Sequence, residues 1–91
     1  MNEQILRMLL TGEVRVLFNK RENNLLREML CTLNKDDIPP EQYGVLSSVL
    51  SSGNPDLIVA WDMEKNDWRS FYATSIVSIR MSEQKKEIEG Q

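Results

Sequence analysis

The chain has 91 residues, of which 41% are hydrophobic and 27% are charged, and its formal net charge is -3. This length corresponds to one small domain, and the acidic balance argues against a protein that coats nucleic acid regardless of sequence, because such binding depends on neutralising phosphates. The chain has no histidine and one cysteine, which excludes an intramolecular disulfide and leaves no imidazole for a zinc site or a catalytic triad.

Residues 1–12 are predicted to form an N-terminal amphipathic helix. Asn2 is a suitable N-cap, Ile5, Met8 and Leu9 share one face, and Gly12 suits the end of the helix. We expect this helix to pack as a lid on one open end of a small sheet. The alternative is a helix that is presented to a partner.

From residue 13 the apolar period changes to two, which predicts a first strand with Val14, Val16 and Phe18 on one face. Residues 20–24 form a charged turn, and residues 25–33 are predicted to be the return strand of a hairpin, with Met29 and Cys31 on its apolar face. Leucines at helical spacing in this second segment would also suit a helix, but the turn directly after a clear strand favours the hairpin.

An insertion at about residues 41–53 separates this hairpin from the later strands. It follows a turn that contains two prolines, and Gly53, Asn54 and Pro55 end it. Its apolar residues fall at spacings of three and four, which predicts a short helix. We take the same residues as candidate contacts for a protein partner: Tyr43, Leu46, Val49 and Leu50.

Three short β-prone runs follow, at residues 57–61, 68–73 and 76–81, and their tight connections predict a three-stranded meander. Residues 82–91 are polar and are expected to be a flexible tail. The sum is a mainly β (α+β) domain over residues 13–81, in which five strands curl into a small, partly open barrel with an N-terminal helix and a short helical insertion.

The sequence contains two blocks that resemble a known family. The first block runs from VLFNK to CTLNKDDIP, and the second is WDMEKNDWRSF followed by SI. Both blocks resemble the small phage-encoded WYL-like family, whose members are assigned an Sm-like, SH3-type β-barrel. The match covers about residues 13–80. The chain departs from the family at residues 29–30, before Cys31, where a basic residue is common, and in its developed insertion. The resemblance implies a bacteriophage origin and an Sm-like barrel, but no established activity.

Several side chains near the last three strands are candidate ligand or nucleic-acid contacts. Trp68 is expected to pack against Trp61 across a hairpin, with base stacking as the alternative. Arg69 points to the opposite face, where arginines of neighbouring strands could join it around a phosphate; alternatively it pairs with Asp62 or Glu64 and locks the turn. The full set is Arg15, Lys65, Trp68, Arg69, Tyr72 and Arg80.

No residues of this chain form a convincing catalytic, cofactor or metal site. Cys31 lies between apolar neighbours and is expected to be a buried structural thiol rather than a nucleophile. The acidic residues Asp62, Glu64 and Asp67 are expected to form a solvated turn rather than a cation site. We therefore predict that the protein is not an enzyme.

Two functions are compatible with the sequence. The first is a phage accessory protein that binds and modulates a host or phage protein, and that self-associates because small barrels leave unpaired edge strands. The second is nucleic-acid or nucleotide recognition on an Sm-like surface, including sequestration of a host nucleotide signal by an oligomer. No apolar run reaches the roughly 20 residues of a membrane span, and the N-terminus lacks signal-peptide features, so we expect a cytoplasmic protein.

Overall fold

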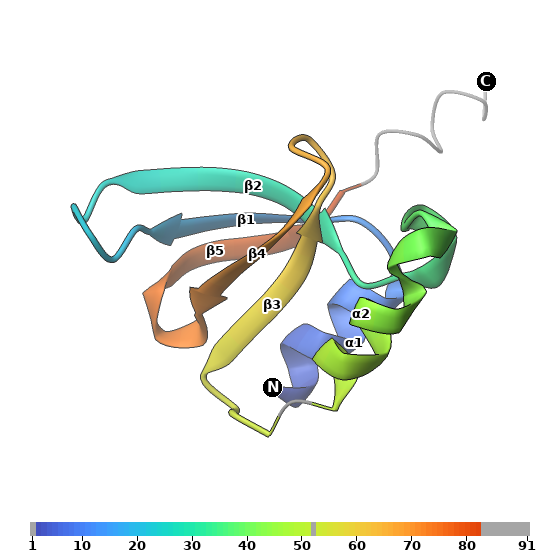
Figure 1. The fold of residues 1–91 in the computed structure, drawn as a ribbon. Coiled ribbons are helices and arrows are strands. Elements are labelled where there is room, and N and C mark those ends of the chain that lie inside the picture. Colours follow the sequence, from blue (N-terminus) through green and yellow to red (C-terminus); the bar gives the residue numbers. More distant parts are fainter. Residues whose placement is uncertain (1, 52, 83–91) are drawn as a thin grey trace.

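The computed structural model describes residues 2–51 and 53–82 and contains a five-stranded antiparallel sheet with two α-helices (Figure 1). In chain order the elements are α1 (Glu3–Thr11), β1 (Val14–Asn19), β2 (Leu26–Thr32), α2 (Tyr43–Leu50), β3 (Leu57–Asp62), β4 (Asp67–Tyr72) and β5 (Ile76–Met81), with 3-10 turns at Lys35–Asp37, Pro40–Gln42 and Ala73–Ser75. The strand order is β4-β3-β2-β1-β5. This confirms the predicted fold class, and it is consistent with a partly open barrel.

The last strand lies elsewhere than predicted. β3 and β4 form the expected hairpin, but β5 pairs with β1 rather than with β4, so the predicted meander is wrong. The 3-10 turn Ala73–Ser75 redirects the chain, and the Ala73 amide donates to the Asp56 carbonyl over 2.7 Å. Pairing with β1 places Ile79 opposite the buried Val16, so burial of this apolar side of β5 favours the return to β1.

The core lies on the inner faces of the strands and under α1. Its strand residues follow the predicted period of two, and they include Val14, Val16, Phe18, Met29, Cys31, Ile58, Ala60 and Phe71. Asn2 caps α1 as predicted, because its side chain accepts from the amides of Gln4 and Ile5 over 3.0 and 3.2 Å. The buried Leu9 and the bond from the Leu33 amide to the Leu9 carbonyl fix α1 against the end of β2.

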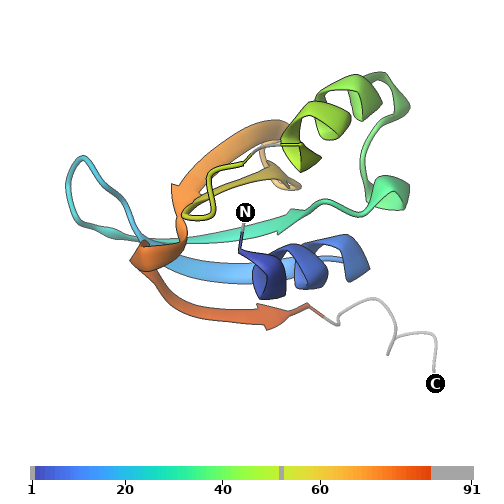
Figure 2. The ribbon, with the colours of Figure 1, turned by 90° about the horizontal axis from the view of Figure 1, so that it is seen from below.

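The second helix lies beside β3 (Figures 1 and 2), and its buried side chains belong to the same hydrophobic core as Trp61. The rings of Trp61 and Trp68 meet edge to face at 5.3 Å, as expected for cross-strand partners, and Trp68 Nε1 donates to Gln42 Oε1 over 2.9 Å. Leu46 and Val49 of α2 are buried. Because this packing buries the side chains of Leu46 and Val49, they are not available to a partner. This corrects the prediction that these two residues are protein-partner contacts.

The remaining insertion residues are more accessible. Tyr43 is half-buried, and its hydroxyl donates to the Lys35 carbonyl over 3.2 Å, whereas Leu50 is exposed. In the described part of the chain, no helix has both the length and the apolar character needed to cross a membrane. The predicted tail lies outside the described residues apart from Ser82, whose amide donates to the Glu13 carbonyl.

Candidate functional site

A cleft of about 270 Å³ lies between the β1–β2 hairpin and β4, and we call it the basic cleft. Its base is apolar, because the buried rings of Phe18 and Phe71 stack there with centroids 4.9 Å apart and planes 19° from parallel. Its walls carry four basic side chains and one acidic side chain, which are Lys20, Arg21, Arg27, Arg69 and Glu22. In a chain with a net charge of -3, this cleft concentrates positive charge.

The opening arises from the way β2 leaves β3. The two strands pair only at Cys31↔Asp62 and Thr32↔Trp61, whereas every residue of β1 pairs with β2. Arg27 lies opposite Phe18 in the β1–β2 ladder, on the same face as Met29, and therefore points into the space that β3 no longer fills. The gap in the sheet thus becomes a polar-walled cleft with an apolar base.

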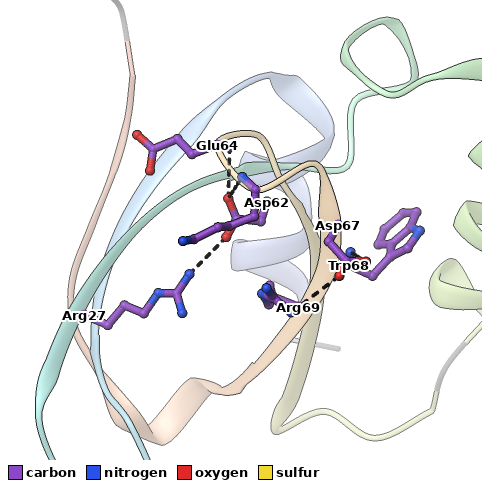
Figure 3. Close-up of polar contacts among 7 residues, drawn as sticks. Arg27, Asp62, Glu64, Asp67, Trp68 and Arg69 are labelled. Atoms are coloured by element: carbon purple, nitrogen blue, oxygen red, sulfur yellow. Dashed lines mark hydrogen bonds and ion pairs between the residues drawn. The ribbon is translucent and has the colours of Figure 1, made fainter.

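An ion pair across this gap holds Arg27 in place (Figure 3). Arg27 Nη2 lies 3.1 Å from Asp62 Oδ2, and the Asp62 side chain is only 1% exposed while that of Arg27 is 29% exposed. Asp62 Oδ1 also accepts from the amides of Glu64 and Lys65 over 2.9 and 3.0 Å. Asp62 therefore locks the β3–β4 turn, and its partner is Arg27 rather than the Arg69 that the sequence suggested.

Arg69 enters the cleft from β4 and is loosely held. Its Nη1 lies 3.6 Å from Asp67 Oδ2, and the two side chains are 41% and 62% exposed. A pair of this length and exposure contributes little to stability. In Figure 3 Arg69 lies on the side of β4 that faces the enclosed space, while Trp68 points away from it toward α2, so the predicted opposition of these two side chains is confirmed.

The hairpin supplies the other wall of the cleft. The Arg21 guanidinium lies over the Tyr72 ring, 4.5 Å from its centroid, which is a cation–π contact. Tyr72 is half-buried and lines both the basic cleft and the shallower hollow beside it. Ser75 donates to the Tyr72 carbonyl over 2.7 Å and so satisfies local backbone.

The predicted cluster of three arginines does not form. Arg15 and Arg80 are direct cross-strand partners on β1 and β5, facing away from Val14 and Val16, and neither lines the basic cleft. Arg69 is on the opposite edge of the strand order, because β5 pairs with β1. Sequence periodicity placed each side chain on a face of its own strand, but it could not show which strands would be neighbours.

Two further candidates also lie outside the cleft. The Trp68 ring is packed against Trp61 and its nitrogen is hydrogen bonded to Gln42, so it is not a free stacking platform. The Lys65 side chain is exposed on the β3–β4 turn, and it is not among the cleft residues. Of the six predicted ligand contacts, only Arg69 and Tyr72 line the basic cleft.

Sequence reasoning missed Lys20, Arg21 and Arg27 as site residues. A signal existed for Arg27, because it continues the two-residue period of Met29 and Cys31 and must share their inner face. Lys20 and Arg21 belong to a charged turn, and such a turn is ordinarily solvated. Only the approach of β4 to this turn makes them part of a site.

Metal and nucleophile chemistry find no support in the described residues. No three or more acidic or cysteine side chains among them are grouped so as to hold a metal ion. Cys31 is buried as predicted, and burial, assisted by the Asp62 carboxylate, raises the pKa of its thiol to about 12. Its thiolate is therefore scarce near neutral pH.

No protein-family model, curated protein or solved structure matches this chain. The resemblance to the phage WYL-like family accordingly stays a prediction.

Proposed function

We propose that this protein is a non-enzymatic binding module whose basic cleft holds a phosphate-bearing ligand of nucleotide size. The observation that carries the proposal is the arrangement of four basic side chains around a base of stacked phenylalanine rings. Guanidinium groups bind phosphate through charge-assisted hydrogen bonds. Because Phe18 and Phe71 are buried and stack on each other, this base offers the planar part of such a ligand an apolar contact rather than a free stacking platform.

The two arginines that line the cleft from β2 and β4 have different parts in this proposal. Asp62 holds Arg27 in a fixed orientation, so little conformational entropy is lost when a ligand binds to its remaining donors. Arg69 has only a long, exposed pair with Asp67. A phosphate can replace that pair at little cost.

The volume of the cleft limits the ligand. About 270 Å³ lies just below the range of roughly 300–1,000 Å³ that is usual for small-molecule pockets. One nucleotide or its phosphate portion is therefore favoured over a long nucleic-acid strand. The net charge of -3 agrees with this choice, because polynucleotide binding depends on many phosphate contacts.

Isothermal titration calorimetry with adenosine monophosphate, inorganic phosphate and adenosine tests the proposal. We expect the monophosphate to bind most tightly, and Arg69→Gln to weaken its binding about tenfold, which corresponds to about 1.4 kcal/mol for one lost charge-assisted contact. Lys65→Gln removes an equal charge outside the cleft and should leave the affinity unchanged. Equal weakening by both variants, or no binding of any of the three probes, would show that the cleft is not a phosphate site.

A second candidate function is docking on a host or phage protein, the role first expected from the sequence. It is favoured by exposed apolar residues that lie outside the basic cleft, including Val77 and Met81 of β5. A phage origin, a cytoplasmic location and self-association through edge strands remain parts of this proposal. If the chain acts during infection, both the phosphate-bearing ligand and the protein partner would be molecules that a bacterial cell contains.

A further inference from the structure

The free edge of β5 combines three features that point to one kind of partner. Among the described strands β5 pairs only with β1, so its other edge is unpaired. An apolar groove adjoins the inner side of this strand, between it and α1, and Ile5, Met8, Ile79 and Met81 line it. The outer side of the strand carries Arg80, and Val77, which lies at the register shift opposite Leu17 and Phe18, is 55% exposed.

The register fixes which backbone groups the edge presents. The Ser82 amide donates to the Glu13 carbonyl, and hydrogen-bonded pairs alternate along an antiparallel ladder. Arg80, opposite Arg15, therefore directs its backbone N–H and C=O toward β1. Ile79 and Met81 direct theirs toward the free edge, and their side chains face the groove side of the sheet.

Charge determines which kind of side chain a partner strand would carry on its outer side. Arg15 and Arg80 lie directly opposite one another, and like charges at such positions are unfavourable. Neither arginine takes part in an ion pair with another described residue. A carboxylate on an added strand beside Arg80 would compensate this local excess of positive charge.

We propose that the β5 edge binds an extended segment of another protein in which apolar and acidic residues alternate. The segment adds to the sheet as an antiparallel strand, in the manner of β-augmentation. Its apolar side chains lie opposite Ile79 and Met81 and enter the groove against α1. Its acidic side chains lie on the outer face beside Arg80. This surface is separate from the basic cleft, since the two share no lining residue.

The probe is a fluorescent peptide of about eight residues, which is a usual strand length. It has alternating valine and glutamate and blocked ends. Fluorescence anisotropy with the full chain at low ionic strength measures its affinity. We expect saturable binding, no binding of the corresponding valine–lysine peptide, and no competition by adenosine monophosphate. Arg80→Glu should weaken binding about fivefold or more, whereas Lys65→Gln should not change it.

Peptide N-methylation tests the strand geometry directly. Methylating the valine amides, which face the β5 edge in the proposed register, should abolish binding, and methylating the glutamate amides should preserve it. Met81→Glu should also weaken binding because it places a charge at the groove. Circular dichroism and tryptophan fluorescence confirm that each variant is folded.

Four results would overturn the proposal. The first three are equal binding of the valine–lysine peptide, an unchanged affinity in Arg80→Glu, and equal effects of methylation at the two sets of amides. A fourth is self-association of the chain, seen by light scattering, that excludes the peptide. That result would assign the edge to a second copy.

Discussion

Replacing Asp62 by asparagine should destabilise the protein strongly, because Asp62 joins the wall of the basic cleft to the β3–β4 turn. The carboxylate is 1% exposed and accepts from Arg27 and from two backbone amides. Asparagine keeps one oxygen as an acceptor for the amides. Its NH2 group, however, cannot accept from Arg27, so the guanidinium loses its partner.

The magnitude follows from the burial of the pair. Removing one partner of a fully buried ion pair costs about 3–5 kcal/mol, and the 29% exposure of Arg27 lets water replace part of the interaction. We therefore expect the free energy of unfolding to fall by about 2–3 kcal/mol. For a domain of this size the melting temperature would fall by roughly 10–20 °C.

Urea denaturation followed by the fluorescence of Trp61 and Trp68 measures the change. Asp67→Asn is the matched control, because Asp67 is a carboxylate of the same hairpin whose ion pair is exposed, and it should cost less than about 0.5 kcal/mol. A double-mutant cycle with Arg27→Met isolates the pair. A loss in Asp62→Asn as small as that in the control, or a coupling energy near zero, would refute the reasoning.

Two further predictions concern ionisation and charge. Because the pKa of Cys31 is raised from 9.0 to about 12, the unfolded chain loses this proton first as the pH rises above about 9. The contribution of this thiol to the free energy of unfolding is therefore fully present below that pH. It should fall by about 1.4 kcal/mol by about pH 10. Urea titrations at about pH 8 and pH 10 should show this extra loss in the wild type but not in Cys31→Ala, and equal losses would exclude the thiol as its source. Arg80→Thr should raise the free energy of unfolding by roughly 0.5 kcal/mol, since it removes one of two like charges in direct cross-strand register; an unchanged value in the same assay would mean that the two guanidiniums do not repel.

The local parts of the fold could be predicted because they depend on short-range patterns. Asn2 and Gly12 bound the first helix, and the alternation of Val14, Val16 and Phe18 identifies both the strand and its inner face. The insertion helix likewise follows from its apolar spacing. In the first helix and the first strand, propensity, period and end signals agree with tertiary burial. The insertion helix contains Gly44 and two serines and has no side-chain N-cap, so its apolar period alone predicts it.

The arrangement of the site could not be predicted, because it depends on contacts between distant segments. No local signal shows that β2 and β3 separate after two residue pairs, or that the Ala73–Ser75 turn sends β5 to β1. Those two events open the basic cleft and move Arg69 away from Arg15. Both events depend on the entropy of loop closure and on the burial of side chains over the whole chain.

The arginines of this acidic chain lie on two different surfaces, for which two kinds of recognition are proposed. Arg27 and Arg69 line the basic cleft, which has an apolar base and for which a small ligand is proposed. Arg15 and Arg80 stand on an open sheet face at the end of the strand order, where the natural complement is another chain rather than a small anion. Because the two pairs belong to different surfaces, single charge-removing substitutions should affect one kind of binding and spare the other, and a variant that weakened both equally would indicate general electrostatics instead of two sites.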